Sequence, residues 1–588
     1  MAEAVPESSI VNWRTKVRNV CLSLITTMAI CAVSLFPSEK TYAQSAPKPA
    51  VVVSLAPLGE QMNDLKYLVN ASGFGKMNFL IQSQVKHFTA GIDRERPSGM
   101  MLFFQGDDPE PQWLGFVAVE DVDDMLDRIA DFADVDEEND LIMISPENGD
   151  EIIAKEVDGY LFIADDKEMF NLAPASPATV LGDLPDNFNL AARVFGQRIP
   201  EELRQKGIDL ISEGYARQME ELGKDDDELF DTQMEQIKSF VNDTEEIMIG
   251  FQADKETGKL ATKMVFRGTP GSELAKRCNA MKDLAPGKFT GFLNSGSAFN
   301  ANMRGKIIEA DIQSYNTLLD QLREQMLEEI DADGELDDDE FSKLETLADD
   351  VISVLKETIE GGEIDGGAVM MMEKGVMNFA SGVKVLNTPK LEKSIKSLAE
   401  MAQEKSDDIV DVKFNSGSYD GVTFHTVTLS IPSDEEEMLK ILGDKFTIMV
   451  GIGTESVYLG VGNDPLPLLT ASIEKSKTAA ELESLNQYNI FLGPILRFAS
   501  GITPEPALEA MADKLEENGK DRISAFSDVI ENGIESRLEM EDGILALIQA
   551  GVEAAQAGAF RETWTNSRIV PQALSLQHSV NKKTADKV

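Results

Sequence analysis

One order of expected strands and helices occurs twice along the 588-residue chain, and this repetition constrains the fold more than any other feature. In each half a β-hairpin, at 99–119 and again at 367–385, precedes an amphipathic helix, the first of which Asp121 is expected to cap. A further hairpin turns at Asp158-Gly159, and Asp420-Gly421 is its apparent counterpart, because Asp-Gly accepts positive φ at both centres of a type I′ turn. We therefore expect an α+β protein of two related halves, each an antiparallel sheet covered by helices.

The repetition divides the chain into a first half at 44–288 and a second half at 289–557. Two strongly periodic helices at 306–362 have no evident counterpart in the first half, so we expect a helical hairpin inserted in the second. The Asp-Gly turns of the two halves lie closer together in sequence than their Tyr-Leu strands do, which predicts an extra hairpin in the second half. A polar composition predicts a disordered tail at 558–588.

The N-terminal segment has the pattern of a secretory signal peptide. Arg14, Lys16 and Arg18 precede an apolar run at 20–36, and Thr41-Tyr-Ala43 places small residues where a signal peptidase would cleave. We expect residues 1–43 to be removed and the protein to be periplasmic or secreted. Retention as an anchor is the alternative, because an apolar run of about 17 residues is near the shortest that spans a bilayer.

The formal charge is −49, from 103 acidic and 54 basic residues. Such a surface repels nucleic acid and anionic lipid, so we expect neither a nucleic-acid partner nor a membrane contact after cleavage. Only Cys278 follows the signal segment, so no intramolecular disulfide is expected even in an oxidising compartment. A hydrophobic core must therefore stabilise the fold.

An acidic loop between the two helices of the predicted hairpin is the best candidate for a metal site. With Gly334 as the bend, the loop places oxygen ligands at the spacing of an EF-hand: Glu329, Asp331, Asp333, the Glu335 carbonyl, Asp337 and Glu340. Ca²⁺ is therefore a possible cofactor, and no other is indicated. The loop departs from the pattern at its first ligand, where Glu329 replaces the usual aspartate. The alternative interpretation is an acidic turn between two packed helices.

Catalytic motifs are absent from the sequence. Its three histidines, His87, His425 and His578, lie far apart, and neither a His-Glu-x-x-His nor a Gly-x-Ser-x-Gly motif occurs. We expect a protein that is not an enzyme. The alternative is a hydrolase that uses carboxylates, with or without Ca²⁺, in a cleft between the halves.

Three short motifs accompany the repeated order of segments: Asp93-Arg-Glu-Arg-Pro97, Arg193-Val-Phe-Gly-Gln-Arg-Ile-Pro200 and Thr269-Pro-Gly-Ser-Glu-Leu-Ala275. Together they resemble a group of uncharacterised, exported, duplicated α+β proteins of planctomycete-type bacteria, and the likeness covers most of the mature chain. The resemblance implies export and no known activity. The expected function is that of a non-enzymatic envelope or extracellular protein, a binding or structural module with an unidentified protein or envelope partner.

Overall fold

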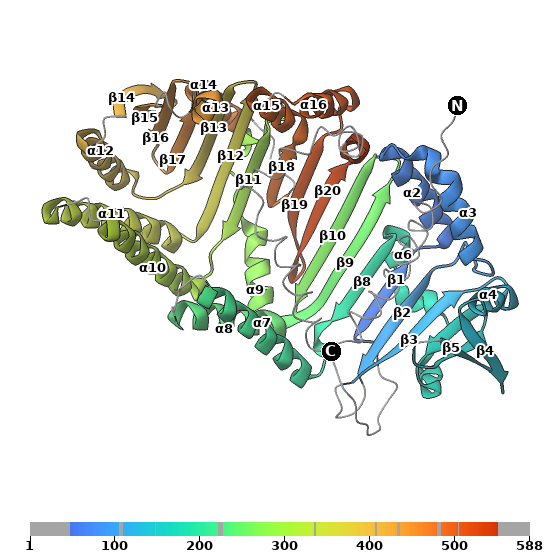
Figure 1. The fold of residues 1–588 in the computed structure, drawn as a ribbon. Coiled ribbons are helices and arrows are strands. Elements are labelled where there is room, and N and C mark those ends of the chain that lie inside the picture. Colours follow the sequence, from blue (N-terminus) through green and yellow to red (C-terminus); the bar gives the residue numbers. More distant parts are fainter. Residues whose placement is uncertain are drawn as a thin grey trace, which may run out of the picture.

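The computed structural model describes residues 48–104, 110–146, 149–221, 227–333, 337–405, 409–431, 436–478, 484–503 and 505–550. Its twenty strands belong to one continuous sheet, and every neighbouring pair is antiparallel (Figure 1). The protein is therefore α+β, with helices segregated to the faces and ends of an antiparallel sheet, as expected from the sequence.

The two halves of the sheet have the same strand order. From its outer edge inward, the first half runs β4 (Ala133–Glu138), β5 (Leu141–Pro146), β6 (Ile152–Val157), β7 (Tyr160–Ala164), β3 (Pro111–Ala118), β2 (Ser98–Phe104), β1 (Val51–Leu55), β8 (Leu190–Phe195), β9 (Thr244–Asp254) and β10 (Lys259–Gly268). The second half runs β14 (Ile409–Tyr419), β15 (Val422–Ser430), β16 (Lys445–Ile452), β17 (Ser456–Gly462), β13 (Val376–Lys384), β12 (Glu363–Glu373), β11 (Phe299–Lys306), β18 (Asn486–Phe491), β19 (Arg522–Ile530) and β20 (Gly533–Glu541). The halves join where β10 pairs with β20, and Lys263 lies opposite Arg537 near the middle of this seam.

Backbone hydrogen bonds recur at corresponding places in the two halves. Ala50 donates to the Leu102 carbonyl over 2.7 Å, and Ala298 donates to the Met370 carbonyl over 2.8 Å. Both bonds tie the start of a half's first strand to its second strand. The two halves therefore share local pairing as well as strand order.

The strand order corrects one expectation about hairpins. Asp158-Gly159 and Asp420-Gly421 both turn with positive φ, as expected, but they are not counterparts. Asp420 follows β14, whose counterpart β4 is followed by the positive-φ pair Asn139-Asp140. The first half thus contains the β4–β5 hairpin, and the prediction of an extra hairpin in the second half is wrong. The acidic sequence of β4 has low β-propensity, which hid this strand.

Helices occupy most of the matching connections in the two halves, although the helix between β15 and β16 has no counterpart among the described residues between β5 and β6. In the first half these are α2 (Leu58–Ala71), α3 (Asn78–Phe88), α4 (Val122–Ile129), η2 (Lys167–Leu172), α5 (Pro177–Leu181), α6 (Leu184–Asn187), α7 (Glu201–Glu221) and α8 (Asp227–Asp243). After the linking elements α9 (Glu273–Ala280) and η5 (Thr290–Phe292), the second half has α10 (Glu309–Asp333), α11 (Asp338–Glu360), α12 (Thr388–Lys405), α13 (Glu436–Leu442), α14 (Leu466–Thr478), α15 (Leu492–Ile502) and α16 (Pro506–Asn518).

The expected helical hairpin of the second half is the pair α10–α11, between β11 and β12. The shorter pair α2–α3 lies between β1 and β2, which is the same place in the first half. The expectation that the hairpin has no counterpart is therefore wrong. The helix that Asp121 caps is α4, since a carboxylate oxygen of Asp121 accepts from the Asp124 amide at 3.1 Å.

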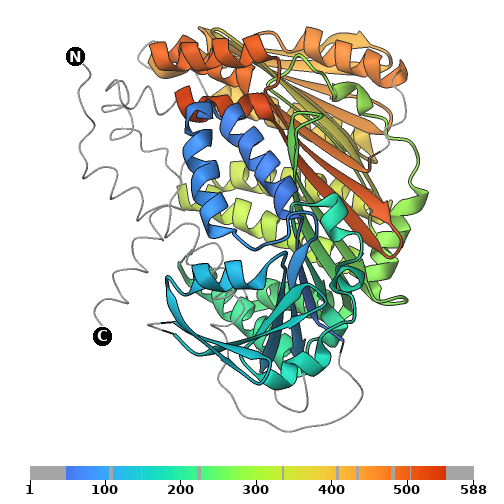
Figure 2. The same cartoon turned by 90° about the vertical axis from the view of Figure 1, so that its right-hand side faces the viewer.

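The sheet has two unlike faces. The pairs α2–α3 and α10–α11 lie on the same side of it, which we call the hairpin face (Figures 1 and 2). The opposite side, the back face, packs against η2 and α5 in the first half and against η5 and α14 in the second, around the buried side chains of Phe116, Phe162, Phe292 and Phe424. At its outer ends the hairpin face is covered as well, by α4 and α12.

The outer edges of the sheet carry features that oppose pairing with another chain. Four carboxylates stand on the edge strand β4, whose sequence is Ala-Asp-Val-Asp-Glu-Glu. The other edge strand, β14, has register shifts between Ile409 and Asp411 and between Lys413 and Gly417. Charges and bulges on edge strands hinder edge-to-edge association, so the faces of the sheet are better candidates for binding than its edges.

Candidate functional site

The residues of the predicted calcium loop lie at the junction of α10 and α11. Glu329, Asp331 and Asp333 belong to α10, whose backbone stays helical through Asp333, and Glu335 lies outside the described residues. Asp337 and Glu340 form a capping box at the start of α11: an Asp337 carboxylate oxygen accepts from the Glu340 amide at 2.9 Å, and Glu340 accepts from the Asp337 amide at 3.1 Å. These two carboxylates thus satisfy amides that a helix start leaves unpaired. Calcium binding stays a prediction, which calorimetric titration with CaCl₂ tests.

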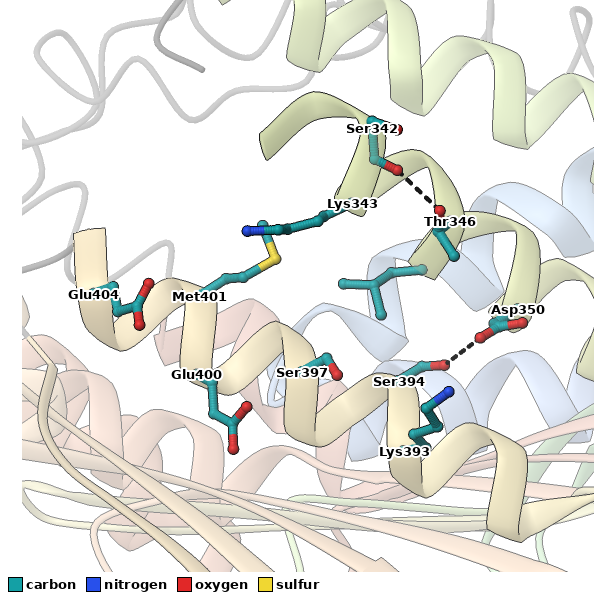
Figure 3. A pocket seen from close by; sticks show the side chains of 11 residues that line it. Ser342, Lys343, Thr346, Asp350, Lys393, Ser394, Ser397, Glu400, Met401 and Glu404 are labelled. Carbon is teal, nitrogen blue, oxygen red and sulfur yellow. Dashed lines mark hydrogen bonds between the residues drawn. The ribbon is translucent and has the colours of Figure 1, made fainter. Parts of the chain in front are cut away.

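A polar groove of about 460 Å³ runs between α11 and α12 (Figure 3). Ser394 donates to Asp350 over 3.5 Å, and the Lys390 ammonium lies 3.2 Å from the same carboxylate. Lys343 and Met401 extend toward each other across the groove. Hydroxyl groups and charges of both signs line it, as is common where two surface helices pack side by side. The groove contains no arrangement that recognises one ligand chemistry.

Of the three histidines, His425 is the one whose side-chain environment the structure describes, and this side chain is only 4% exposed. Its Nδ1 accepts from the Asn415 amide at 3.1 Å, so the proton of the neutral ring is on Nε2, which lies 3.3 Å from Glu392 of α12. Glu392 also accepts from Lys396 at 2.6 Å. The ring therefore ties α12 to β15. Because it is buried, it is a structural histidine rather than an acid or base that could reach a substrate.

Burial, reinforced by the Lys396 ammonium, lowers the pKa of His425 below its ordinary value of 6.5. Between that value and the lower folded-state pKa, the unfolded chain binds a proton that the folded chain does not, so stability falls as the pH falls below about 6.5. We expect the stability advantage of the parent over His425→Asn to shrink between pH 7.5 and pH 5. Urea unfolding at both values measures this difference, in which the many carboxylates cancel. A constant difference would contradict the assignment.

Cys278 lies on α9 and is buried. Burial raises the pKa of its thiol, which disfavours the nucleophilic thiolate, so the residue acts as a small apolar side chain. Within the described residues, no group of three or more His, Cys, Asp or Glu side chains is placed to hold a metal ion. No helix of the described part is long and apolar enough to cross a membrane.

The residues of the three short motifs have structural places in the fold. Arg96 donates to the Gly159 carbonyl at 2.8 Å and lies over the Tyr160 ring, which ties it to the β6–β7 turn. Arg198 donates to the Pro49 carbonyl at 2.7 Å and stacks on Phe195. Ser272 caps α9 by accepting from the Ala275 amide. These side chains hold loops against the sheet, and the motifs do not converge on a common site.

The centre of the hairpin face is a different kind of surface. Between the pairs α2–α3 and α10–α11, the strands around the seam present large apolar side chains that are 36–51% exposed: Ile249 and Phe251 of β9, Met264 of β10, Leu538 of β20, Tyr488 and Ile490 of β18, and Met303 of β11. Directly opposed residues of paired strands share a face. Ile249 pairs with Met264, and Ala525 pairs with both Leu538 and Tyr488, so these side chains share the hairpin face.

Charge is missing from this central surface. Apart from Glu245, which lies at the register shift near the start of β9, the alternate positions that point to this side in the described strands are uncharged: Ile247, Ile249 and Phe251; Leu260, Thr262, Met264 and Phe266; Ile534, Ser536, Leu538 and Met540; Ile523, Ala525, Ser527 and Val529; Asn486, Tyr488 and Ile490. We call these residues, together with Met303, the open face. In a chain of net charge −49, a surface that contacts only solvent is expected to carry charged side chains. An uncharged, exposed surface that spans several strands is therefore a candidate binding surface.

The back of the same strands carries the charges. Along the seam, Lys259 lies 2.6 Å from Glu539 and Lys263 lies 2.8 Å from Glu535, and Arg537 lies within 3.6 Å of both carboxylates. The five side chains form an alternating ladder of ion pairs that joins the halves. At the seam, the back face therefore carries ion pairs and the hairpin face carries apolar side chains.

Buried polar groups continue this pattern on the back of the second half. Asn489 of β18 donates to Asn300 of β11 over 2.7 Å and accepts from Ser524 of β19 at 2.8 Å. All three side chains are at most 4% exposed. Hydrogen bonding across three strands therefore replaces apolar packing at this point of the back face.

Sequence reasoning identified several of these strands but not the open face. Alternation in 247–252 and 260–266 indicates that one side of each strand is apolar. It does not indicate which side the helices will cover. One pattern in the sequence does bear on this question. On one side of β10 and β20 stand the charged residues Lys259, Lys263, Glu535 and Glu539, so the apolar residues between them must point to the other side of the sheet.

The chain was compared with protein-family models, with curated proteins and with solved structures. No family model matches the chain, and no curated protein or solved structure matches it significantly.

Proposed function

We propose that the chain is an exported, non-enzymatic binding protein that holds its partner on the open face. The observation that carries the proposal is the exposed, uncharged centre of the hairpin face, where seven large apolar side chains from Ile249 to Met303 are 36–51% exposed. Contiguous exposed apolar surface of this kind marks binding sites in soluble proteins. Export rests on the N-terminal pattern of basic residues, apolar run and small residues.

The framework around the open face favours a preformed binding surface. Ion pairs such as that of Lys259 with Glu539 join the strands of the seam behind it, and the hydrogen bond of Asn489 with Asn300 joins β18 to β11. A helical pair stands on either side of it, α2–α3 near β9 and α10–α11 beyond β11 (Figures 1 and 2). A sheet supported in this way can present apolar groups to a partner without first rearranging, which lowers the cost of binding.

Photo-crosslinking from the open face tests the proposal. The full chain is expressed in a bacterial host, once with p-benzoylphenylalanine in place of Leu538 and once in place of Val410, which lies on the edge strand β14 and is 52% exposed. The periplasmic and secreted fractions are irradiated and analysed by mass. We expect the chain in these fractions and a defined adduct from position 538 that exceeds any from position 410. Equal adducts, or none from position 538, would contradict binding at the open face, and a chain confined to the cytoplasm would contradict export.

A further inference from the structure

We propose that the partner on the open face is a basic amphipathic helix of another polypeptide, whose apolar side lies on the sheet and whose cationic side faces the pair α10–α11. This inference rests on the proposed function and adds the chemistry of the partner. It follows from the contrast between an uncharged surface and the acidic helical pair that stands beside it.

The first step is the charge of the helical pair. The sequences of α10 and α11 each contain eight carboxylates, against one basic residue in α10 and two in α11. Of these three, Arg323 pairs with Glu345 and Asp349, and Lys356 pairs with Asp320 at 2.6 Å. Pairs within the hairpin thus engage two of its three cations, and a large excess of negative charge remains. The field beside the open face therefore attracts a cationic group.

The second step is an exposed stripe on α10. An apolar stripe of helical spacing, Tyr315, Leu318, Leu322 and Met326, is 39–50% exposed along it. Glu324 and Glu328 are exposed on the same helix. An apolar stripe with neighbouring carboxylates matches a partner helix that has apolar and cationic positions three and four residues apart.

The third step separates this partner from others. A second copy of the chain would bring a further charge of −49 toward the acidic pair, and a nucleic acid would bring its phosphates, so both are repelled. A neutral lipid would match the apolar surface but would gain nothing from the carboxylates of α10 and α11. A basic amphipathic helix is the occupant that uses both features.

Fluorescence anisotropy with defined peptides tests the inference on the full exported chain. The probe is a labelled 18-residue peptide of leucine and lysine with leucine at helical spacing, and its counterpart has glutamate in place of every lysine. We expect saturable binding of the lysine peptide at low salt, weaker binding at high salt, and no binding of the glutamate peptide.

Variants of the chain assign the site. Met264→Gln with Leu538→Gln removes apolar groups that are 45% and 51% exposed, and we expect at least tenfold weaker binding of the lysine peptide. The matched control, Leu398→Gln with Val410→Gln, changes side chains that are 50% and 52% exposed outside the open face and should change affinity less than twofold. Because all four side chains are exposed, both variants should fold, which circular dichroism verifies.

The carboxylates are tested separately. Glu324→Gln with Glu328→Gln should weaken binding of the lysine peptide about three- to tenfold at low salt, because each removes an attractive charge from the acidic helical pair. Glu509→Gln with Glu517→Gln makes the same change in net charge on α16, where both residues are exposed, and should have little effect. Equal effects of the two pairs would mean that net charge alone attracts the peptide, which would overturn the assigned role of α10.

Further outcomes distinguish the inference from the proposed function. If both peptides bind equally and the Met264 and Leu538 variant weakens both, the open face binds partners but the cationic class is wrong. If neutral phosphatidylcholine vesicles bind through the open face and the lysine peptide does not, the partner is a lipid surface. If that variant alters binding of neither the peptides nor the vesicles, the proposed function itself fails.

Discussion

Replacing Asn489 with leucine should lower the free energy of unfolding by about 2–6 kcal/mol. The amide of Asn489 links Asn300 and Ser524 through hydrogen bonds of 2.7 and 2.8 Å, and all three side chains are buried. Leucine has a similar volume but cannot bond, so it leaves two buried polar groups without these partners, and each costs about 1–3 kcal/mol. Urea unfolding followed by circular dichroism measures the loss.

The neighbouring residue provides the matched control. Tyr488 is the larger and more apolar side chain, but it stands on the open face and is 36% exposed. Tyr488→Leu should therefore cost less than about 1 kcal/mol, since much of the ring is already in water. Equal losses from the two variants would mean that the polar side of β18 is not the stabilising side, and the assignment of the two faces would be wrong.

Replacing both Glu535 and Glu539 with glutamine should destabilise the protein by about 1–3 kcal/mol at low salt. Lys263 lies directly opposite Arg537 across the seam, so the two carboxylates separate cations that would otherwise repel each other. The carboxylate side chains are only 19% and 13% exposed, which makes these pairs stronger than fully solvated ones. The loss should shrink in 0.5 M NaCl, because salt screens both the lost attraction and the remaining repulsion.

The control for this variant is Glu509→Gln with Glu517→Gln, which removes the same charge from the exposed surface of α16. That variant should be as stable as the parent or slightly more stable, because it lowers the self-repulsion of a chain with net charge −49. Urea midpoints at two salt concentrations compare the variants. If the seam variant behaved like this control, the ion-pair ladder would have no role in joining the halves.

Local signals predicted a large part of the fold. The turns at Asp158-Gly159 and Asp420-Gly421, the capping residue Asp121 and the periodicity of α10 and α11 each rest on neighbours in sequence. The pairing of β10 with β20 does not, since it joins Lys263 to Arg537 across most of the second half. No local pattern specifies which distant strand β10 will pair with, so the sequence alone does not predict that the two halves form one continuous sheet.

The candidate sites differ in the same way. The box formed by Asp337 and Glu340 was visible in the sequence as an acidic residue followed three positions later by glutamate, which is a helix-start signature as well as a fragment of a calcium loop. The open face was not visible in this sense. Met264 and Leu538 look like core residues in their strands, and only the placement of α2–α3 and α10–α11 toward the sides leaves them exposed.

The continuous sheet fixes the distance between the two helical pairs, and this distance favours partners of a matching length. Because β10 and β20 are paired along nearly all of their residues, no hinge separates the halves, and the distance between the two helical pairs is set by the number of strands between them. The open face spans β9, β10, β20, β19, β18 and β11, roughly 25–30 Å at about 4.8 Å per strand. A helix of about 18 residues, at 1.5 Å per residue, just crosses that distance. A shorter partner helix would leave apolar groups of the open face uncovered, and a longer one would project beyond these strands. The open face therefore favours partner helices of a matching length as well as of a matching charge.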